Sequence, residues 1–167
     1  MKRTLFTFGV IFLLVTSCNQ NSKSKTIREG EPDVYNINSS DSKMNEAIKN
    51  AKKSFDLFQN ALTSKNPDFE YFSIKQKFDT PQGGEHIWVQ DIRFVNSQFV
   101  GIIGNEPVNT NEVSLGDTIT IDKNKISDWM YFDKGITRGG FTIKVLRDQM
   151  TEEEQKSFDL ESGLLFE

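Results

Sequence analysis

The stretch FEYFSIKQKF, residues 69–78, has the most regular pattern in the chain and decides the fold class. Neighbouring side chains of an extended strand point to opposite faces, so every second residue shares a face. The apolar face carries Phe72, Ile74 and Phe78, and the polar face carries Lys75 and Lys77. Such alternation predicts a strand of an antiparallel sheet that is covered on one face only.

Four segments that follow also indicate strands. They are EHIWVQDIRFV (85–95), FVGIIGN (99–105), DTITI (117–121) and GGFTIKVL (139–146). Short, turn-forming stretches such as TPQGG separate the first of these segments, and short connections favour antiparallel neighbours. We therefore expect a curved antiparallel sheet of about five strands.

Helical periodicity appears on both sides of the strand region. Apolar residues recur at steps of three and four along 41–63, which predicts an amphipathic N-terminal helix. They are Met44, Ile48, Ala51, Phe55, Phe58 and Leu62. Near the other end, Thr151 and Glu154 form a capping box for a short C-terminal helix, which Gly163 ends. The predicted fold is α+β, with the first helix packed on the sheet in a single domain at 41–167.

The N-terminal residues MKRTLFTFGVIFLLVTSC indicate export. Lys2 and Arg3 precede an uncharged apolar run that is shorter than the about 20 residues of a membrane span, so residues 1–17 form a signal peptide rather than a membrane anchor. LVTSC resembles the lipobox of bacterial lipoproteins, which implies lipid on Cys18. Residues 18–40 then form a flexible tether. NQNSK after the cysteine lacks the acidic cluster that some of these lipoproteins use for surface export, so the resemblance implies a periplasm-facing position in the envelope.

Composition excludes several classes of function. The formal charge is −4, and it becomes −6 when Lys2 and Arg3 leave with the signal peptide. An acidic chain without a basic stripe is a poor nucleic-acid binder. The chain has no phosphate-binding or dinucleotide motif and no nucleophile elbow. With one histidine and one cysteine it makes a weak zinc site. We therefore expect neither a cofactor nor a metal.

His86, the only histidine, is the first candidate for chemistry. It follows Glu85 directly, so the two side chains point to opposite faces of a strand and do not form a pair there. His86 shares a face with Trp88, and this favours a half-buried imidazole hydrogen-bonded to a loop carbonyl. The alternative is a catalytic base, with Asp128 or Glu85 as orienting group or acid.

Three further segments supply candidate binding residues. GNEP contains Asn105, ISDWMY contains Asp128 and Trp129, and RGGFT contains Gly139 and Gly140. With Trp88, the predicted binding residues are Asn105, Trp129, Gly139 and Gly140. If these loops converge at one end of the sheet, Glu85, His86, Asn105, Asp128 and Trp129 line a cleft.

Five motifs occur in a fixed order: EHIWV, GIIGNEP, LGDTITI, ISDWMY and GGFTIKVL. In this order and at these spacings the chain resembles the YegJ-like family of bacterial proteins, domain of unknown function 2314, over residues 69–146. The resemblance implies a recurring set of polar and aromatic positions. It implies no reaction.

The function predicted from the sequence is that of an envelope lipoprotein acting as a non-enzymatic binding or interaction module. Its partners are the membrane, through the lipid on Cys18, and a protein or small-molecule ligand whose identity stays open. The alternatives are a small hydrolase-like enzyme that uses His86 with Asp128 or Glu85, and a purely structural envelope protein.

Overall fold

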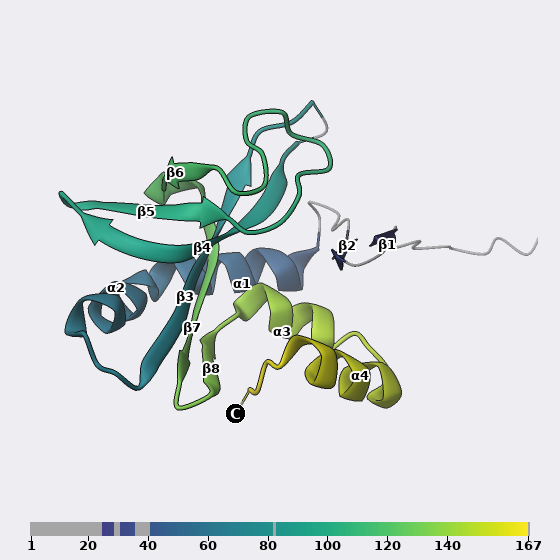
Figure 1. The fold of residues 1–167 in the computed structure, drawn as a ribbon. Helices are drawn as coiled ribbons and strands as arrows, with labels where there is room; N and C mark the ends of the chain where they lie inside the picture. Colours follow the sequence, from purple (N-terminus) through teal and green to yellow (C-terminus); the bar gives the residue numbers. More distant parts are fainter. Residues whose placement is uncertain (1–24, 29–30, 36–40, 82, 167) are drawn as a thin grey trace, which may run out of the picture.

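The computed structural model describes residues 25–28, 31–35, 41–81 and 83–166 (Figure 1). The predicted signal peptide and Cys18 lie outside this part of the chain. The helical segments are α1 (Ser42–Lys53), α2 (Phe55–Ser64), the 3-10 turn η1 (Lys123–Lys125), α3 (Phe141–Arg147) and α4 (Glu152–Ser162). The strands are β1 (Lys25–Arg28), β2 (Glu31–Tyr35), β3 (Phe69–Phe78), β4 (Glu85–Val95), β5 (Gln98–Ile103), β6 (Thr118–Thr120), β7 (Ile126–Asp133) and β8 (Ile136–Gly139).

The main sheet has six strands in the order β6-β5-β4-β3-β7-β8, and all neighbouring pairs are antiparallel. The fold is therefore α+β with an antiparallel sheet, as the sequence predicted, but with six strands rather than about five. The segment FEYFSIKQKF, as β3, lies in the middle of the sheet. The pairing of β1 with β2 falls in the predicted tether, where no strands were expected.

Bulges curve this sheet. Tyr71 has a φ of 54° where the pairing of β3 with β7 shifts, and Asp91 has a φ of 51° where the pairing of β4 with β5 shifts. An extra residue on one strand bends that strand and increases its twist. Figure 1 shows β4 and β5 as curved strands above the straighter β3 and β7. The predicted curvature thus has identifiable positions.

The core lies between the sheet and the first two helices. Ile74 at its centre is opposite Val89 on one side and Trp129 on the other, and all three are buried. The Trp129 indole N–H donates to the carbonyl of Ala51 in α1 at 2.9 Å. Phe58 of α2 is fully buried among aromatic rings, and such burial contributes about 1.5–3 kcal/mol.

The N-terminal helix predicted over 41–63 is two helices in the structure. Asp41 caps α1 by accepting from the backbone N–H of Lys43 and Met44. The chain then bends at Ser54, whose hydroxyl donates to the carbonyl of Asn50 at 2.7 Å. A serine hydroxyl that bonds back to the preceding turn often bends a helix. The bend lets α1 and α2 each follow the curved sheet.

The prediction of a last strand at GGFTIKVL is wrong. Its two glycines end β8 and lead into helix α3, while the preceding segment, ISDWMY, forms the missed strand β7. At the C-terminus the capping box of Thr151 and Glu154 and the helix end at Gly163 are confirmed. The tail after α4 returns to the sheet, where the N–H of Thr137 donates to the carbonyl of Leu165 at 2.7 Å.

Candidate functional site

Glu85 begins β4, and its buried carboxylate anchors the loop between β5 and β6. Its Oε1 accepts from the backbone N–H of Val108 at 2.8 Å. Its Oε2 accepts from those of Asn109 at 2.8 Å and Thr110 at 2.9 Å. Three N–H donors occupy both oxygens. Glu85 therefore holds the loop and does not face His86.

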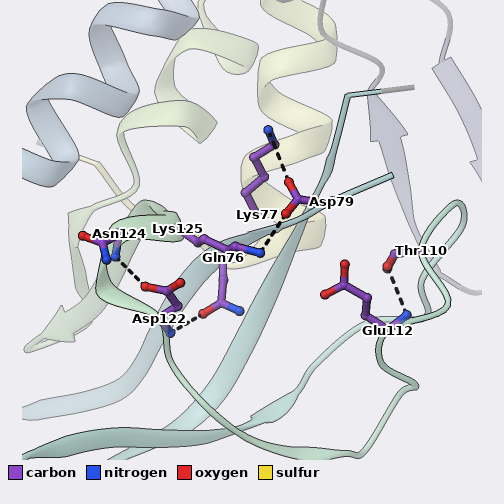
Figure 2. A network of polar contacts seen from close by, with 8 residues as sticks. All are labelled: Gln76, Lys77, Asp79, Thr110, Glu112, Asp122, Asn124 and Lys125. Carbon is purple, nitrogen blue, oxygen red and sulfur yellow. Dashed lines mark hydrogen bonds and ion pairs between the residues drawn. The ribbon is translucent and has the colours of Figure 1, made fainter. Parts of the chain in front are cut away.

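Asn105 ties the start of the same loop to β4. Its side-chain oxygen accepts from the backbone N–H of Trp88 at 3.2 Å. Farther along the loop, the Thr110 hydroxyl accepts from the N–H of Glu112 at 3.2 Å, as Figure 2 shows. The predicted binding residue Asn105 thus acts within the structure as a second anchor of this loop.

A polar network fixes the neighbouring end of β3 (Figure 2). The side-chain oxygen of Gln76 accepts from the backbone N–H of Asp122 at 2.8 Å, which attaches the start of η1. Beyond the strand, Asp79 lies 2.8 Å from the ammonium of Lys125 and 3.8 Å from that of Lys77. The hydrogen bond from Lys125 lowers the pKa of Asp79. These contacts join β3 and η1.

Replacing Glu85 with alanine should cost about 2 kcal/mol of unfolding free energy, because three backbone N–H groups, that of Thr110 buried, lose a charged acceptor. Hydrogen exchange should locate the loss: the amides of Val108, Asn109 and Thr110 should lose protection. Glu112→Ala is the matched control, because that exposed carboxylate accepts none of these bonds. Unchanged protection of the three amides in the Glu85 variant would contradict the anchoring role.

Asp128 lies in the middle of β7, and its side chain is fully buried. Its Oδ1 accepts from the backbone N–H of Trp129 at 2.8 Å and of Phe141 at 3.1 Å. Its Oδ2 accepts from the N–H of Thr142 at 2.7 Å and from the Thr142 hydroxyl at 2.6 Å. Burial raises the pKa of Asp128, while the bonds from Thr142 and the charge of Lys75 act in the opposite direction. The carboxylate holds the first turn of α3 against the sheet.

His86 stands on the outer side of β4, opposite Lys77 of β3, and is exposed. Within the described residues its imidazole makes no hydrogen bond to a loop carbonyl, contrary to the structural role predicted. Its pKa is lowered to about 4, first by desolvation and then by the positive charges of Lys75, Lys77 and Lys52. Of these causes, an added anion would offset the lysine charges.

The structure does not pair His86 with either proposed carboxylate. Glu85 points to the opposite face of β4 and is bound by the loop. Asp128 lies on β7, and β3 runs between it and β4, a separation of about 9–10 Å between strand axes. Trp129 faces the helices, so these residues and Asn105 do not line one cleft. This geometry gives no support to the His86-based hydrolase.

A groove of about 500 Å³ opens between α2, β7, β8 and the start of α3. It brings together the predicted residues Trp129 and Gly139. The other lining residues are Leu57, Asn60, Ala61, Ser64, Phe69, Tyr131, Arg138 and Phe141. Burial, followed by the charge of Asp133, raises the pKa of Tyr131, so its hydroxyl stays protonated at neutral pH. The groove is thus aromatic and carries one guanidinium.

Gly139 and Gly140 make this groove possible. Gly139 has a φ of 81°, and a Cβ there would touch the carbonyl oxygen of Trp129 and lie 2.6 and 2.8 Å from its ring. Gly140, at φ 65°, then starts α3. Both positions are in the left-handed region that glycine adopts without a steric penalty. The backbone can therefore pass directly over Trp129.

The described residues contain neither a cluster of metal-ligating side chains nor a membrane-spanning helix. Nowhere in these residues do three or more histidine, cysteine or acidic side chains gather as metal ligands would. None of the helices there has the length and apolar character needed to cross a bilayer.

Comparison with known proteins defines the family. Residues 41–166 match the model described as "Uncharacterized protein conserved in bacteria (DUF2314)". The chain belongs to this family. The resemblance noted on five motifs is confirmed, and the match extends on both sides of residues 69–146 to take in α1, α2 and α4.

Two relatives in the DUF2314 family are informative. The uncharacterized protein YegJ of Escherichia coli K12 is 32% identical over 146 residues, which cover 87% of this chain and 88% of YegJ. A Neisseria meningitidis serogroup B protein named "Putative ankyrin repeat protein NMB1133/NMB1171" is 33% identical over 145 residues, 82% of this chain and 57% of that protein. This chain therefore spans little more than half of the Neisseria relative. No solved structure matches this chain.

The structure adds residues that sequence reasoning missed. Leu57, Tyr131 and Arg138 line the groove, and none of them was among the predicted binding residues. Lys75 and Lys77 were placed correctly on the polar face of their strand, but their position beside His86 and Trp88 depends on the register of β3 with β4. Strand alternation in the sequence shows which face a side chain is on. It does not show the register, which decides the neighbours of that side chain on the next strand.

Proposed function

We propose that this DUF2314 protein is a lipoprotein of the bacterial envelope that acts as a non-enzymatic binding module. Lipid on Cys18 would hold it at the membrane, facing the periplasm. The anchor rests on the apolar leader and on LVTSC at residues 14–18. Several acyl chains on one cysteine give lasting attachment, which a single chain does not.

The groove between α2 and β7 is the observation that carries the binding role. Its volume of about 500 Å³ falls in the range of ligand sites, and its lining is mostly aromatic and aliphatic. Leu57 on its rim is 61% exposed. An exposed leucine beside aromatic rings is typical of a surface that a protein partner covers. We assign an apolar segment of an envelope protein as the occupant.

The chemistry of the lining favours binding over catalysis. Side chains in the groove offer rings, methyl groups, hydroxyls, an amide and the guanidinium of Arg138, which forms a 3.1 Å ion pair with Asp133. None of the lining residues is a carboxylate or an imidazole. General acid–base catalysis needs such a group within hydrogen-bond reach of the substrate. A groove of this composition instead selects by shape and apolar area.

A pull-down from detergent-solubilised membranes tests the proposal. The full-length wild type should capture a specific partner, and Leu57→Glu should lose it, because a charge at the groove must be desolvated on binding. Leu160→Glu is the matched control, since that leucine lies on α4 outside the groove and is 86% exposed. In the same preparation Cys18→Ser should leave the membrane fraction.

Capture of the same partner by wild type and by Leu57→Glu would overturn the groove as the binding surface. If the wild type captures no specific partner at all, the binding role is overturned. A Cys18→Ser protein that remained in the membrane fraction would overturn the lipid anchor alone.

A further inference from the structure

A second cluster of side chains lies on the other face of the sheet from the core. By the pairing of β3 with β4, Lys75 is opposite Trp88 and Lys77 is opposite His86. Ile74 and Val89, in the neighbouring pair, point into the core, so these four side chains point away from it. We call Lys75, Lys77, His86 and Trp88 the cationic row.

The ammonium of Lys75 has few partners in the structure. Its ammonium lies 5.4 Å from the centre of the Trp88 ring and 3.4 Å from the hydroxyl of Thr142. An ammonium carries three N–H donors, and within the described residues this long hydrogen bond is the only one that the Lys75 ammonium makes. The oxygens of the nearby Asp128 already accept four hydrogen bonds from other donors. Burial lowers the pKa of Lys75, while the charge of Asp128 acts to raise it, so a bound anion would further favour the ammonium form. Lys75 therefore has N–H donors that an additional acceptor can take.

The charges around His86 create a demand for an anion. Lys75 and Lys77 from β3 and Lys52 from α1 all disfavour its protonated form. Two carboxylates face the row. Asp128 acts on Lys75. Asp79 lies 3.8 Å from Lys77 but is held at 2.8 Å by Lys125. The chain as a whole carries a net charge of −4, so this concentration of lysines is a local feature. The side chain of Lys77 packs over Gly84, because its aliphatic stem occupies the position that a Cβ would take there.

We propose that the cationic row binds a single oxyanion, the carboxylate or phosphate group of a small ligand. Residues two apart on a strand are about 6.5–7 Å apart, and cross-strand neighbours about 5 Å. At these spacings the polar ends of Lys75, Lys77 and His86 can reach one such group. The ammonium groups supply N–H donors, His86 supplies a further one, and Trp88 offers an apolar wall.

The single histidine makes this proposal directly measurable. NMR of histidine-labelled full-length protein in a mild detergent gives one imidazole signal, that of His86. Inorganic phosphate and acetate are titrated separately at pH 6.5, against sodium chloride at the same ionic strength. One oxyanion should shift the signal saturably. Saturation by phosphate alone would assign a phosphate ligand, and saturation by acetate alone a carboxylate ligand.

The same signal reports a pH effect with a defined sign. A bound anion stabilises the imidazolium, so the pKa of His86 should rise above its value of about 4. By linkage, a rise of about 1 means that the anion binds about tenfold more tightly to the protonated form. Equal shifts in phosphate, acetate and chloride would show charge screening only and would overturn the proposal.

Lysine variants distinguish binding by specific side chains from general electrostatic attraction of anions. Lys75→Met and Lys77→Met should each weaken oxyanion binding at least about fivefold. Lys156→Met, on exposed α4, should leave it unchanged. If Lys75→Met does not fold, Lys77→Met decides, and wild-type affinity in that variant would overturn the proposal. The row and the groove share no residue, so either proposal can fail without the other.

Discussion

Replacing Asp128 with alanine should reduce the free energy of unfolding by about 3–5 kcal/mol, which is among the largest effects of a single substitution. The change removes the acceptor of four hydrogen bonds and leaves the N–H groups of Trp129, Phe141 and Thr142 facing a cavity. Each buried donor left without a partner costs about 1–3 kcal/mol. The start of α3 should detach from β7 as well, because Asp128 is the capping group that Gly140 cannot supply.

Urea denaturation followed by tryptophan fluorescence measures this loss as a lower midpoint. For a domain of this size the melting temperature should fall by about 10 °C or more. Asp56→Ala is the matched control: that aspartate is exposed in the first turn of α2 and should cost less than about 1 kcal/mol. Thr142→Val removes only the two bonds of the hydroxyl, to Asp128 and from Lys75, and should fall between the two. A midpoint for Asp128→Ala equal to that of Asp56→Ala would refute the account.

The role of Asp128 also explains why the sequence misled about this region. Ile126, Ser127, Asp128 and Trp129 are buried in succession, because the bulge in β7 and the contact with α3 cover both sides of the strand. Alternation, the usual sign of a strand, is therefore absent there. An aspartate is also disfavoured in strands, so the local pattern favoured a turn. The hydrogen bonds that make this position tolerable come from residues 13 and 14 places along the chain.

The segment FTIKVL failed for the converse reason. Its alternation fits a strand, but the backbone at Gly140 is left-handed and the Asp128 carboxylate accepts from the next two N–H groups. Those contacts start a helix, α3. By contrast β3, β4 and β5 were predicted well, because each carries its pattern along its whole length.

For the candidate sites, the sequence identified special residues but not their roles. Glu85, Asn105 and Asp128 are polar residues at demanding positions, and the structure employs their oxygens as acceptors for backbone N–H groups. Carboxylates that could act on a ligand and carboxylates that hold a loop are indistinguishable until the spatial partners are known. Trp129 and Trp88 were both selected as binding residues, and the sheet places them on opposite faces.

The second large effect concerns Gly139, where alanine should cost about 3 kcal/mol or more. Its φ of 81° disfavours any side chain by about 1–2 kcal/mol. The larger part is steric, because the new methyl group would meet the carbonyl and the ring of Trp129, which cannot move without disturbing the core. Gly135 provides a matched control: it has the same φ of 81°, but nothing lies within 4 Å of its Cβ position.

Gly135→Ala should therefore lose only the conformational cost, about 1–2 kcal/mol, and the difference between the two variants measures the close approach to Trp129. The indole should report it too, because Trp129 packs against Phe141 at the start of α3 and lines the groove. We expect Gly139→Ala to perturb near-ultraviolet circular dichroism at temperatures where it is still folded, and Gly135→Ala to leave that spectrum unchanged. Equal losses of stability would mean that the left-handed backbone alone requires glycine at 139. In that case the fit of the backbone over Trp129 would not be what shapes this side of the groove.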